Sequence, residues 1–491
     1  MKCHLNLWSE IQQLKGVMYE YYLEIFKILN DELYTYLSYT RLGRIMTLKT
    51  KIRFQDKFCS LLFLTIFFIP WVQAQTKVTW WAESNADRDP VFQKKLVDVF
   101  NSSQNEIELV MEFKENLNDI LRTAMVAGEG PDIVETPGPS YVKEYQDAGL
   151  LQSMQTYSDK YGWKDLLLPW SYNAGVFDGE FYSAPKTYET MILLYNKTLF
   201  QEKGWKIPTN LNEYEDLAKN VKSSGMNVFS YGSTGWQPTH EHLAGMYLNS
   251  VAGPDNVYQG LIGEKRWDSP EFVEAIELLR KHMVDEGYWS GSLENYYSLG
   301  WDDFHAQFAN RNAAMMTIGT WTFQATENGF RDINDDWDWA PFPNLTSNGG
   351  EPSFLLALGT TLSINGQSKS PDSAAKVIDF IFKNKALVLD MANDFNFGEF
   401  VIPLKYTSAD FGDNVNPKVR RYLIEFAEAT GKGNYGYTTW TFWPSEPGVH
   451  IWKDMEVLWA GELNAQEYME DHEKLWSKAR RKNATLPVGK R

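Results

Sequence analysis

Residues 77–135 alternate between short apolar strands and amphipathic helices, and this order constrains the fold more than any other feature. The segments 77–83 (KVTWWAE) and 106–113 (EIELVMEF) predict two strands, and residues 132–135 predict a third. Apolar residues at helical spacing lie between them, over residues 89–100 and 117–127. A β-α-β-α-β order predicts a parallel sheet with right-handed crossovers in an α/β protein.

Ligands of open α/β sheets bind beyond the carboxyl ends of the strands, so the loops after Glu83 and Val134 are the first candidates for a site. Further along the chain, start signals predict more helices. Asn210 with Glu213 forms a capping-box pattern. Three further helix starts are predicted where a polar N-cap residue precedes a proline at the first helical position: Asp89-Pro90, Ser269-Pro270 and Ser370-Pro371.

The first 74 residues carry the pattern of a secretory signal peptide. Residues 58–69 form a 12-residue apolar stretch, which is too short to span a bilayer as a helix. Basic residues precede it, and Pro70 and the small-residue site ending at Ala74 follow it, so cleavage is expected after Ala74. Met46 would start a signal of ordinary length, which leaves residues 1–45 as a mis-set start or a genuine extension. The alternative, a buried core helix, does not account for the basic flank.

Removal of residues 1–74 changes the composition argument. The 491-residue chain has a formal net charge of −17, and the excised part holds nine Lys or Arg and six Asp or Glu, so the remaining 417 residues carry −20. A chain this acidic is a poor binder of nucleic acid or anionic membranes. Both cysteines, Cys3 and Cys59, are removed, which leaves no disulfide and no thiolate metal site. Cys59 opens the apolar stretch instead of following it, so it is not a lipid anchor.

Signatures of catalysis and metal binding are mostly absent from the sequence. There is no GxGxxG, P-loop or GxSxG motif. The two histidines of His240-Glu241-His242 lie at i and i+2, unlike a zinc-binding HExxH, and we interpret the segment as the start of a helix. The acidic run 332–338 has Trp337 where a calcium loop needs glycine, which indicates an exposed turn. The sequence leaves open whether the chain has a carboxylate pair for glycoside hydrolysis, because the two carboxylates could lie anywhere in the chain.

Aromatic residues are unusually frequent, at 15% of the chain with 19 tryptophans. The faces of tryptophan rings stack on the apolar faces of pyranose rings, and carboxylates and amides bind sugar hydroxyls. Most of these tryptophans are expected in the core, because ligand sites are few and small, and we expect about a quarter of them to contact ligand.

Eight motifs occur in an order that resembles the extracellular solute-binding proteins of ABC importers, in the group of the maltose- and glycerol-3-phosphate-binding proteins. The most specific is DGEFYSAPKTYETMILLYNKTLFQEKGWKIPTNLNEYEDLAK. The others include KVTWWAE, MVAGEGPDIVET, AGLLQSM, FANRNAAMMTIGTWTF, WAPFP, SAAKVIDFIFKNKALVLDM and EVLWAGELNAQEYMEDHEKLW. Together they cover nearly all of the 417 residues.

The resemblance implies a type II periplasmic-binding-protein-like fold, with two α/β lobes joined by hinge crossings and a ligand cleft between them. By this resemblance, residues 77–187 and 360–402 form lobe 1, and residues 188–359 and 403–491 form lobe 2. Closure of the lobes on ligand is then a hinge motion.

The resemblance and the strand ends together imply the ligand-binding residues. Trp321 matches the family's stacking tryptophan in a G-x-W segment, and Trp236 with Gln237 and Trp440 with Trp443 match the places of other aromatic contacts. Which of Trp440 and Trp443 faces the cleft is left open. The remaining candidates come from strand ends and from the place of a family carboxylate: Glu83, Asn85, Glu135, Ser140, Tyr188 and Glu189.

The function implied is capture of a sugar in the periplasm and its delivery to an ABC permease in the inner membrane, by a monomer without catalysis, cofactor, metal or nucleic-acid partner. The missing lipobox favours a periplasm closed by a second membrane. Two alternatives remain. One is a secreted carbohydrate-active enzyme with a carboxylate pair, and the other is a binder of glycerol phosphodiesters or compatible solutes, which would need cationic side chains in the cleft.

Overall fold

A computed structural model of the chain describes residues 75–86, 88–235, 239–395, 400–413 and 415–490. The predicted export signal, residues 1–74, lies outside the described residues, as do the candidate ligand residues Trp236 and Gln237. Residues Gln75–Arg491 form one compact unit. Within its described part, no helix is long and apolar enough to cross a membrane.

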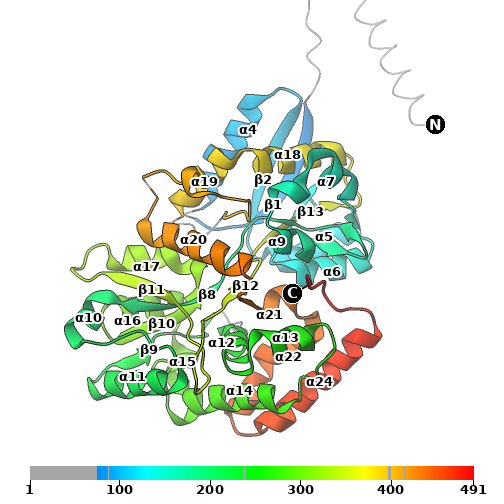
Figure 1. Cartoon of the computed structure of the whole chain (residues 1–491). Coiled ribbons are helices and arrows are strands. Elements are labelled where there is room, and N and C mark those ends of the chain that lie inside the picture. The colour runs from blue at the N-terminus through cyan, green and yellow to red at the C-terminus, as the bar shows by residue number, and fades with distance from the viewer. Residues whose placement is uncertain (1–74, 87, 236–238, 396–399, 414, 491) are drawn as a thin grey trace, which may run out of the picture. The chain divides into compact units, whose positions relative to one another are not determined.

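One half of this unit is built on a mixed sheet that we call the β1 sheet (Figure 1). Its strand order is β2-β1-β3-β13-β4, and β7 pairs with β13. The strands are β1 (Thr76–Glu83), β2 (Ile107–Lys114), β3 (Ile133–Thr136), β4 (Leu151–Gln152), β7 (Ala184–Pro185) and β13 (Thr361–Asn365). β1 pairs in parallel with both β2 and β3, which confirms the predicted parallel β-α-β-α-β start.

Alternation and helical spacing explain this first sheet. Val78, Trp80 and Ala82 point from β1 into the core and are buried. Helix α5 (Leu117–Ala127) buries one face and ends at Gly128, whose φ of +77° is readily adopted only by glycine. The first helix begins at Asp89, so our assignment of Asp89 as the N-cap is wrong by one residue. Its carboxylate instead accepts hydrogen bonds from the preceding loop.

The other half contains the β8 sheet, with strand order β11-β8-β10-β9 (Figure 1). Its strands are β8 (Met191–Asn196), β9 (Asn227–Phe229), β10 (Ala313–Gly319) and β11 (Trp337–Pro341). Every residue of β10 is buried, as expected for a strand covered on both faces. Two small pairs complete the strands: β5 (Val176–Phe177) with β6 (Glu180–Phe181), and β12 (Phe354–Leu356) with β14 (Tyr435–Tyr437).

Helices cover both sheets. In the first half of the chain they are α3 (Asp89–Val91), η2 (Phe92–Val97), α4 (Asp98–Ser103), α6 (Pro139–Asp147), α7 (Gln155–Tyr161), α8 (Trp163–Leu166), α9 (Pro169–Ala174), α10 (Lys197–Lys203), α11 (Leu211–Ser223), α12 (Thr239–Tyr247) and η3 (Leu248–Ala252). Then follow α13 (Pro254–Leu261), α14 (Pro270–Arg280), η4 (Lys281–Asp285), α15 (Leu293–Ser298), α16 (Trp301–Ala309), η5 (Thr320–Thr322), α17 (Phe323–Phe330), α18 (Pro371–Lys383) and α19 (Lys385–Asp394). The last are η6 (Ser408–Asp410), α20 (Pro417–Gly431), α21 (Thr439–Phe442), α22 (Ser445–Lys453), α23 (Met455–Trp459) and α24 (Ala465–Arg481).

The predicted helix starts are largely confirmed. α14 and α18 begin at Pro270 and Pro371, although neither preceding serine caps its helix through the side chain. At α11, the side chain of Asn210 accepts the backbone N–H of Glu213. The Glu213 carboxylate accepts from Thr209 instead of returning to Asn210, so only half of the capping box forms.

Three chain segments cross side by side between the two sheets. The backbone N–H of Lys186 donates to the carbonyl of Thr360, and that of Glu189 donates to the carbonyl of Ala357. The N–H of Tyr188 donates to the carbonyl of Val401 on the third segment. At Gly359, an added Cβ would lie 1.7 Å from Oε1 of Glu189, so this crossing has no room for a side chain. The lobe boundaries given above stay a prediction.

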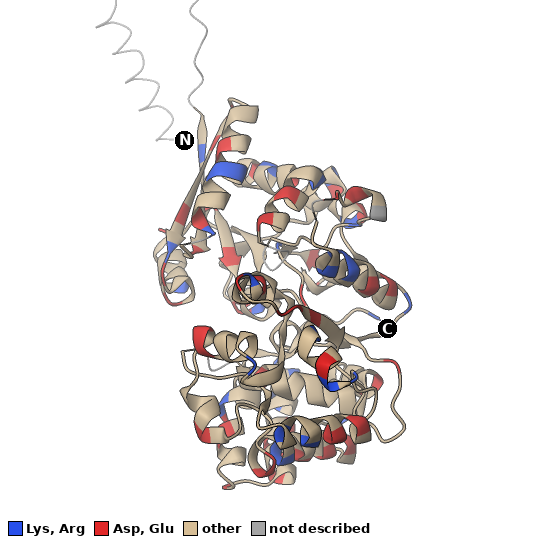
Figure 2. Ribbon diagram, turned by 90° about the vertical axis from the view of Figure 1, so that its left-hand side faces the viewer, with Lys and Arg blue, Asp and Glu red and all other residues tan. Residues whose placement is uncertain are grey.

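Acidic and basic residues are interspersed along the helices of both halves (Figure 2). Many of them pair across one turn or between neighbouring elements, as Lys376 does with Glu106 at 2.8 Å. Exposed pairs of this kind contribute little to stability. The fold depends instead on two large apolar cores, one under each sheet.

Candidate ligand-binding site

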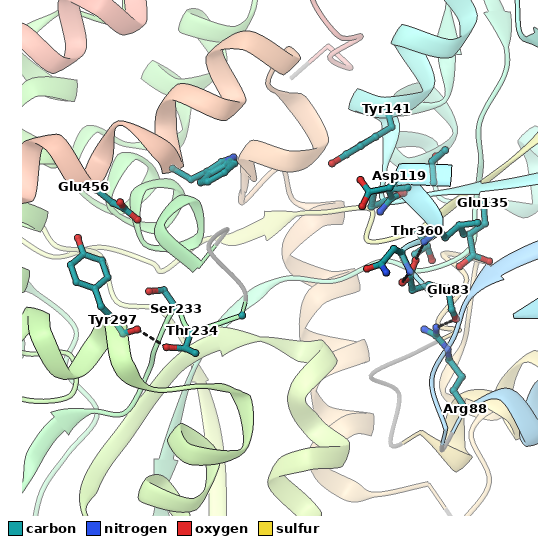
Figure 3. Close-up of a pocket in the computed structure, with 17 residues that line it drawn as sticks. Glu83, Arg88, Asp119, Glu135, Tyr141, Ser233, Thr234, Tyr297, Thr360 and Glu456 are labelled. Carbon is teal, nitrogen blue, oxygen red and sulfur yellow. Dashed lines mark hydrogen bonds between the residues drawn. The ribbon is translucent and has the colours of Figure 1, made fainter. Parts of the chain in front are cut away.

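A cavity of ≈ 1220 Å³ opens between the two halves of the unit (Figure 3). One wall is lined by residues at or after the carboxyl ends of β1, β2 and β3, together with Thr360 just before β13: Glu83, Arg88, Asn116, Leu117, Asn118, Asp119, Glu135, Thr136, Pro137, Tyr141 and Thr360. The facing wall consists of Ser233, Thr234, Gly235, Tyr297, Trp452 and Glu456. Two of the sequence-predicted residues, Glu83 and Glu135, lie in this lining.

Glu83 ends β1 and anchors the neighbouring helix. Its two carboxylate oxygens accept the backbone N–H groups of Asn116 at 3.1 Å and Leu117 at 2.9 Å, at the start of α5. The side chain of Arg88 donates to the Glu83 backbone carbonyl. A carboxylate at a helix N-terminus is favourable because it satisfies free N–H groups and the helix dipole. Glu83 therefore fixes the cavity wall formed by the α5 entry.

Glu135 ends β3 and is held by two intramolecular partners. Nζ of Lys186 lies 2.7 Å from Oε1, and Nε1 of Trp80 donates to Oε2 at 3.0 Å. The carboxylate and the ammonium group are both almost fully buried, and the ammonium also lies over the ring of Phe92. This pair forms a rigid base of the cavity beside the crossing segments.

Trp321 and Trp440 come together around a buried histidine. The ring of His242 lies 5.2 Å from that of Trp321 and 5.0 Å from that of Trp440, and the two tryptophan rings are 5.9 Å apart, edge to face. Both tryptophans are partly exposed. Trp321 folds back over Gly319, where an added Cβ would lie 1.8 Å from a ring carbon. The G-x-W segment thus needs glycine because the ring occupies the space of a side chain.

Trp443 lies away from this pair. It is 1% exposed and packs in an aromatic cluster with Trp267, Trp476 and His472. Of the two C-terminal tryptophans, Trp440 is the one beside Trp321.

Four other predicted residues lie outside the cavity lining. Asn85 is exposed and organises the turn before α3. Ser140 donates to the backbone carbonyl of Trp440 at 3.1 Å, a contact between the two halves. Tyr188 is in the core, with its ring near those of Tyr422 and Phe426, because it points inward from the crossing segment. Glu189 lies on that same crossing segment, and Oγ1 of Thr187 donates to it at 3.4 Å.

The lining includes residues that sequence reasoning missed. Asn116–Asp119 follow the second strand, β2. Ligands bind beyond the carboxyl ends of such strands, and we applied this expectation to the first and third strands but not to the second. Tyr141 is 43% exposed at the start of α6. Tyr297, Trp452 and Glu456 carry no local signal, because only tertiary packing brings them to the cavity.

The charge of the lining is predominantly negative. Among the described lining residues, four are acidic (Glu83, Asp119, Glu135 and Glu456) and one is basic (Arg88). Such a lining disfavours anionic ligands and supplies acceptors for hydroxyl groups. Among the residues that the structure describes, no cluster of His, Cys, Asp and Glu could hold a metal ion.

Comparisons with known proteins agree with this architecture. The family model of bacterial extracellular solute-binding proteins matches residues 82–387. The multiple sugar-binding protein of Streptococcus mutans is 24% identical over 304 residues, 60% of this chain and 68% of the relative. The maltotriose-binding protein of Pyrococcus abyssi is 23% identical over 336 residues, 65% of this chain and 66% of the relative. The chain therefore spans about two thirds of the length of these two curated relatives.

Solved structures show the same fold. A chitin oligosaccharide binding protein superposes with a TM-score of 0.70 at 18% identity, covering 83% of this chain and 99% of the other. An ABC transporter solute-binding protein from Thermotoga lettingae bound with α-D-tagatose gives 0.62 at 18% identity, covering 82% and 99%. Two mixed α/β halves with a cavity between them, together with the family match, confirm the predicted type II periplasmic-binding-protein-like fold. The chain belongs to the family of bacterial extracellular solute-binding proteins.

Proposed function

We propose that this protein captures a sugar and delivers it to the permease of an ABC importer. The observation that carries the proposal is the cavity between the two halves, which is lined by carboxylates. The Trp321–Trp440 pair lies outside that lining, but Ser140, which donates to the backbone carbonyl of Trp440, directly precedes the lining residue Tyr141. The relatives support it, since they are named for binding multiple sugars, maltotriose and, in Bacillus subtilis, galactooligosaccharide.

The lining favours a neutral sugar over a phosphorylated ligand. A glycerol phosphodiester needs cationic donors, and the side chain of Arg88 already donates to the carbonyl of Glu83. The cavity volume of ≈ 1220 Å³ exceeds that of most small-molecule pockets and accommodates more than one sugar ring.

The protein acts without chemistry in this proposal. The cavity carboxylates Glu83 and Glu135 are committed to backbone N–H groups, Lys186 and Trp80, which suits a fixed binding surface better than a proton donor or nucleophile. A secreted carbohydrate-active enzyme is the competing function, and turnover of a bound sugar distinguishes the two.

Export and lobe closure complete the proposal. Residues 1–74 direct the chain to the periplasm, where it diffuses as a monomer and meets its permease. Lobe 1 (77–187 and 360–402) and lobe 2 (188–359 and 403–491) close on the sugar about the three crossing segments. Ligand favours the closed form through its contacts with both walls of the cavity.

Replacement of Trp321 with Ala is expected to weaken sugar binding about 30-fold or more, because loss of a buried aromatic anchor typically costs at least 2 kcal/mol of binding free energy. A thermal-shift screen of neutral oligosaccharides first identifies a ligand, and a tryptophan fluorescence titration then measures its Kd. Equal affinity in the variant and the wild type would refute the role of Trp321.

Gly319→Ala gives a matched test that keeps the tryptophan. The φ of Gly319 is −86°, so alanine is compatible with the backbone, and only the Trp321 ring must move. We expect weaker binding with the main transition of thermal unfolding retained. If Gly319→Ala binds as the wild type does, the position of the Trp321 ring does not contribute to affinity.

A further inference from the structure

The side chain of Glu241 is buried in the first turn of α12 without an ion pair among the described residues. It is 9% exposed, and its Oε2 accepts a 2.8 Å hydrogen bond from the hydroxyl of Thr439 in α21. The other two buried carboxylates of the described chain have cationic partners, Lys186 for Glu135 and Arg480 for Glu473. Burial of an unpaired carboxyl group costs free energy, so stability does not explain a glutamate at this position.

Glu241 interacts with a residue of the cavity wall, Tyr141, and with a residue next to the tryptophan pair, Thr439. Its neighbour in sequence, His242, contacts both Trp321 and Trp440, and its hydrogen-bond partner Thr439 directly precedes Trp440. Tyr141 belongs to α6 and lines the cavity. Burial, and next the negative charge of Glu241, raise the pKa of Tyr141.

We infer that Glu241 is a specificity-determining ligand residue, whose carboxylate accepts hydrogen bonds from hydroxyl groups of a sugar ring held beside Trp440 and Trp321. The inference rests on the proposed function. An ionised carboxylate has two oxygens and no donor, so it pairs with the hydroxyl donors of a sugar and with no group that only accepts. Among the described residues, Thr439 is the hydrogen-bond donor to Glu241, and bound sugar provides further donors.

The protonation state of Glu241 provides a second readout. Burial raises its pKa to about 7, against the lowering effect of the Thr439 hydrogen bond. The groups that interact with it are Thr439 of α21 and the phenols of Tyr141 and Tyr231, and the titratable neighbours on its own helix are His240 and His242. Among the described residues, no charged side chain of α6, α12, α14, α21 or α22 shifts the pKa of Glu241. The carboxylate therefore predominates at pH 8, and the protonated acid predominates at pH 6.

The test compares Glu241→Gln with the wild type on a panel of maltotriose, raffinose and N,N′-diacetylchitobiose. At pH 8 we expect the variant to bind the preferred sugar about 10- to 100-fold more weakly, because a hydrogen bond to a charged acceptor is lost. Wild-type affinity is expected to fall from pH 8 to pH 6, while the affinity of the variant stays constant. The unliganded variant should unfold at the same temperature as the wild type or higher, because an unpaired buried charge has been removed.

Glu144→Gln is the matched control, because Glu144 is an exposed carboxylate of α6 that pairs only weakly, 3.8 Å from Arg122. The Glu144→Gln variant should bind the preferred sugar with the same affinity as the wild type. Two results would overturn the inference: Glu241→Gln binds sugar as tightly as the wild type at pH 8, or its sugar affinity and its unfolding temperature both fall. In either case, sugar binding by the wild type still supports the proposed function. A wild-type protein that binds no sugar would overturn the proposed function itself, and the inference with it.

Discussion

Replacement of Lys186 with Met is expected to lower the free energy of unfolding by about 3–5 kcal/mol, as found when one member of a buried ion pair is removed. The ammonium group lies 2.7 Å from Oε1 of Glu135, and both side chains are almost fully buried. Without Lys186, the carboxylate remains in the core with the indole N–H of Trp80 as its hydrogen-bond donor. Urea denaturation of the unliganded protein measures the loss.

Two further variants separate the buried charge from the lost lysine. In the double variant Glu135→Gln with Lys186→Met, no charge is left in the core, so most of the lost stability should return. Lys197→Met is the exposed control, because the pair of Lys197 with Asp336 is 38% and 49% exposed and is expected to contribute at most about 1 kcal/mol. A loss in Lys186→Met no larger than that in Lys197→Met would contradict our description of the cavity base.

Acidification is expected to unfold the protein by about pH 4, because six buried histidines must be protonated. They are His240, His242, His282, His305, His450 and His472. Burial lowers the pKa of His240, His282 and His305 to about 4 and that of His242 to about 3. Burial also lowers the pKa of His450 and His472.

The sign follows from proton uptake. A histidine with a lowered pKa in the folded state binds its proton more readily when the chain unfolds, so its contribution is present above pH 6.5 and is lost as the pH falls through 4. A lowering of the pKa from 6.5 to about 4 corresponds to about 3 kcal/mol, and several such shifts together are comparable to the usual stability margin of about 5–15 kcal/mol. Glu241 acts in the opposite sense, because its raised pKa favours the folded state below pH 4.5 and that contribution is lost as the pH rises through 7.

Thermal unfolding followed by circular dichroism at intervals from pH 8 to pH 4 tests this prediction. The melting temperature should fall steeply below pH 6.5. A constant melting temperature down to pH 4 would mean that these histidines are not buried in their neutral form.

The start of the β1 sheet could be predicted from sequence because its signals are local. Alternation of apolar residues and turn residues located β1, β2 and β3 to within one residue, and parallel pairing followed from the helices between them. Asn196 closes β8 and caps α10 through its side chain. Each of these features depends on neighbours within one or two turns of chain.

The site depends on distant contacts, which the sequence does not display. Glu135 was predicted as a ligand acceptor, but Lys186, 51 residues later, binds the same carboxylate. Trp440 and Trp443 are three residues apart and would share a face if the helix continued. Helix α21 ends at Phe442, and the chain becomes extended at Trp443, which turns into the aromatic core.

Calorimetric titration of the purified protein with the best oligosaccharide from the screen, followed by mass analysis of the recovered sugar, tests the central claim most directly. We predict saturable binding at a single site, with a Kd of about 1 μM or below, and recovery of the sugar unaltered. Absence of binding to every sugar tested, or recovery of cleaved or modified sugar, would contradict the assignment of this protein as a sugar-binding component of an importer.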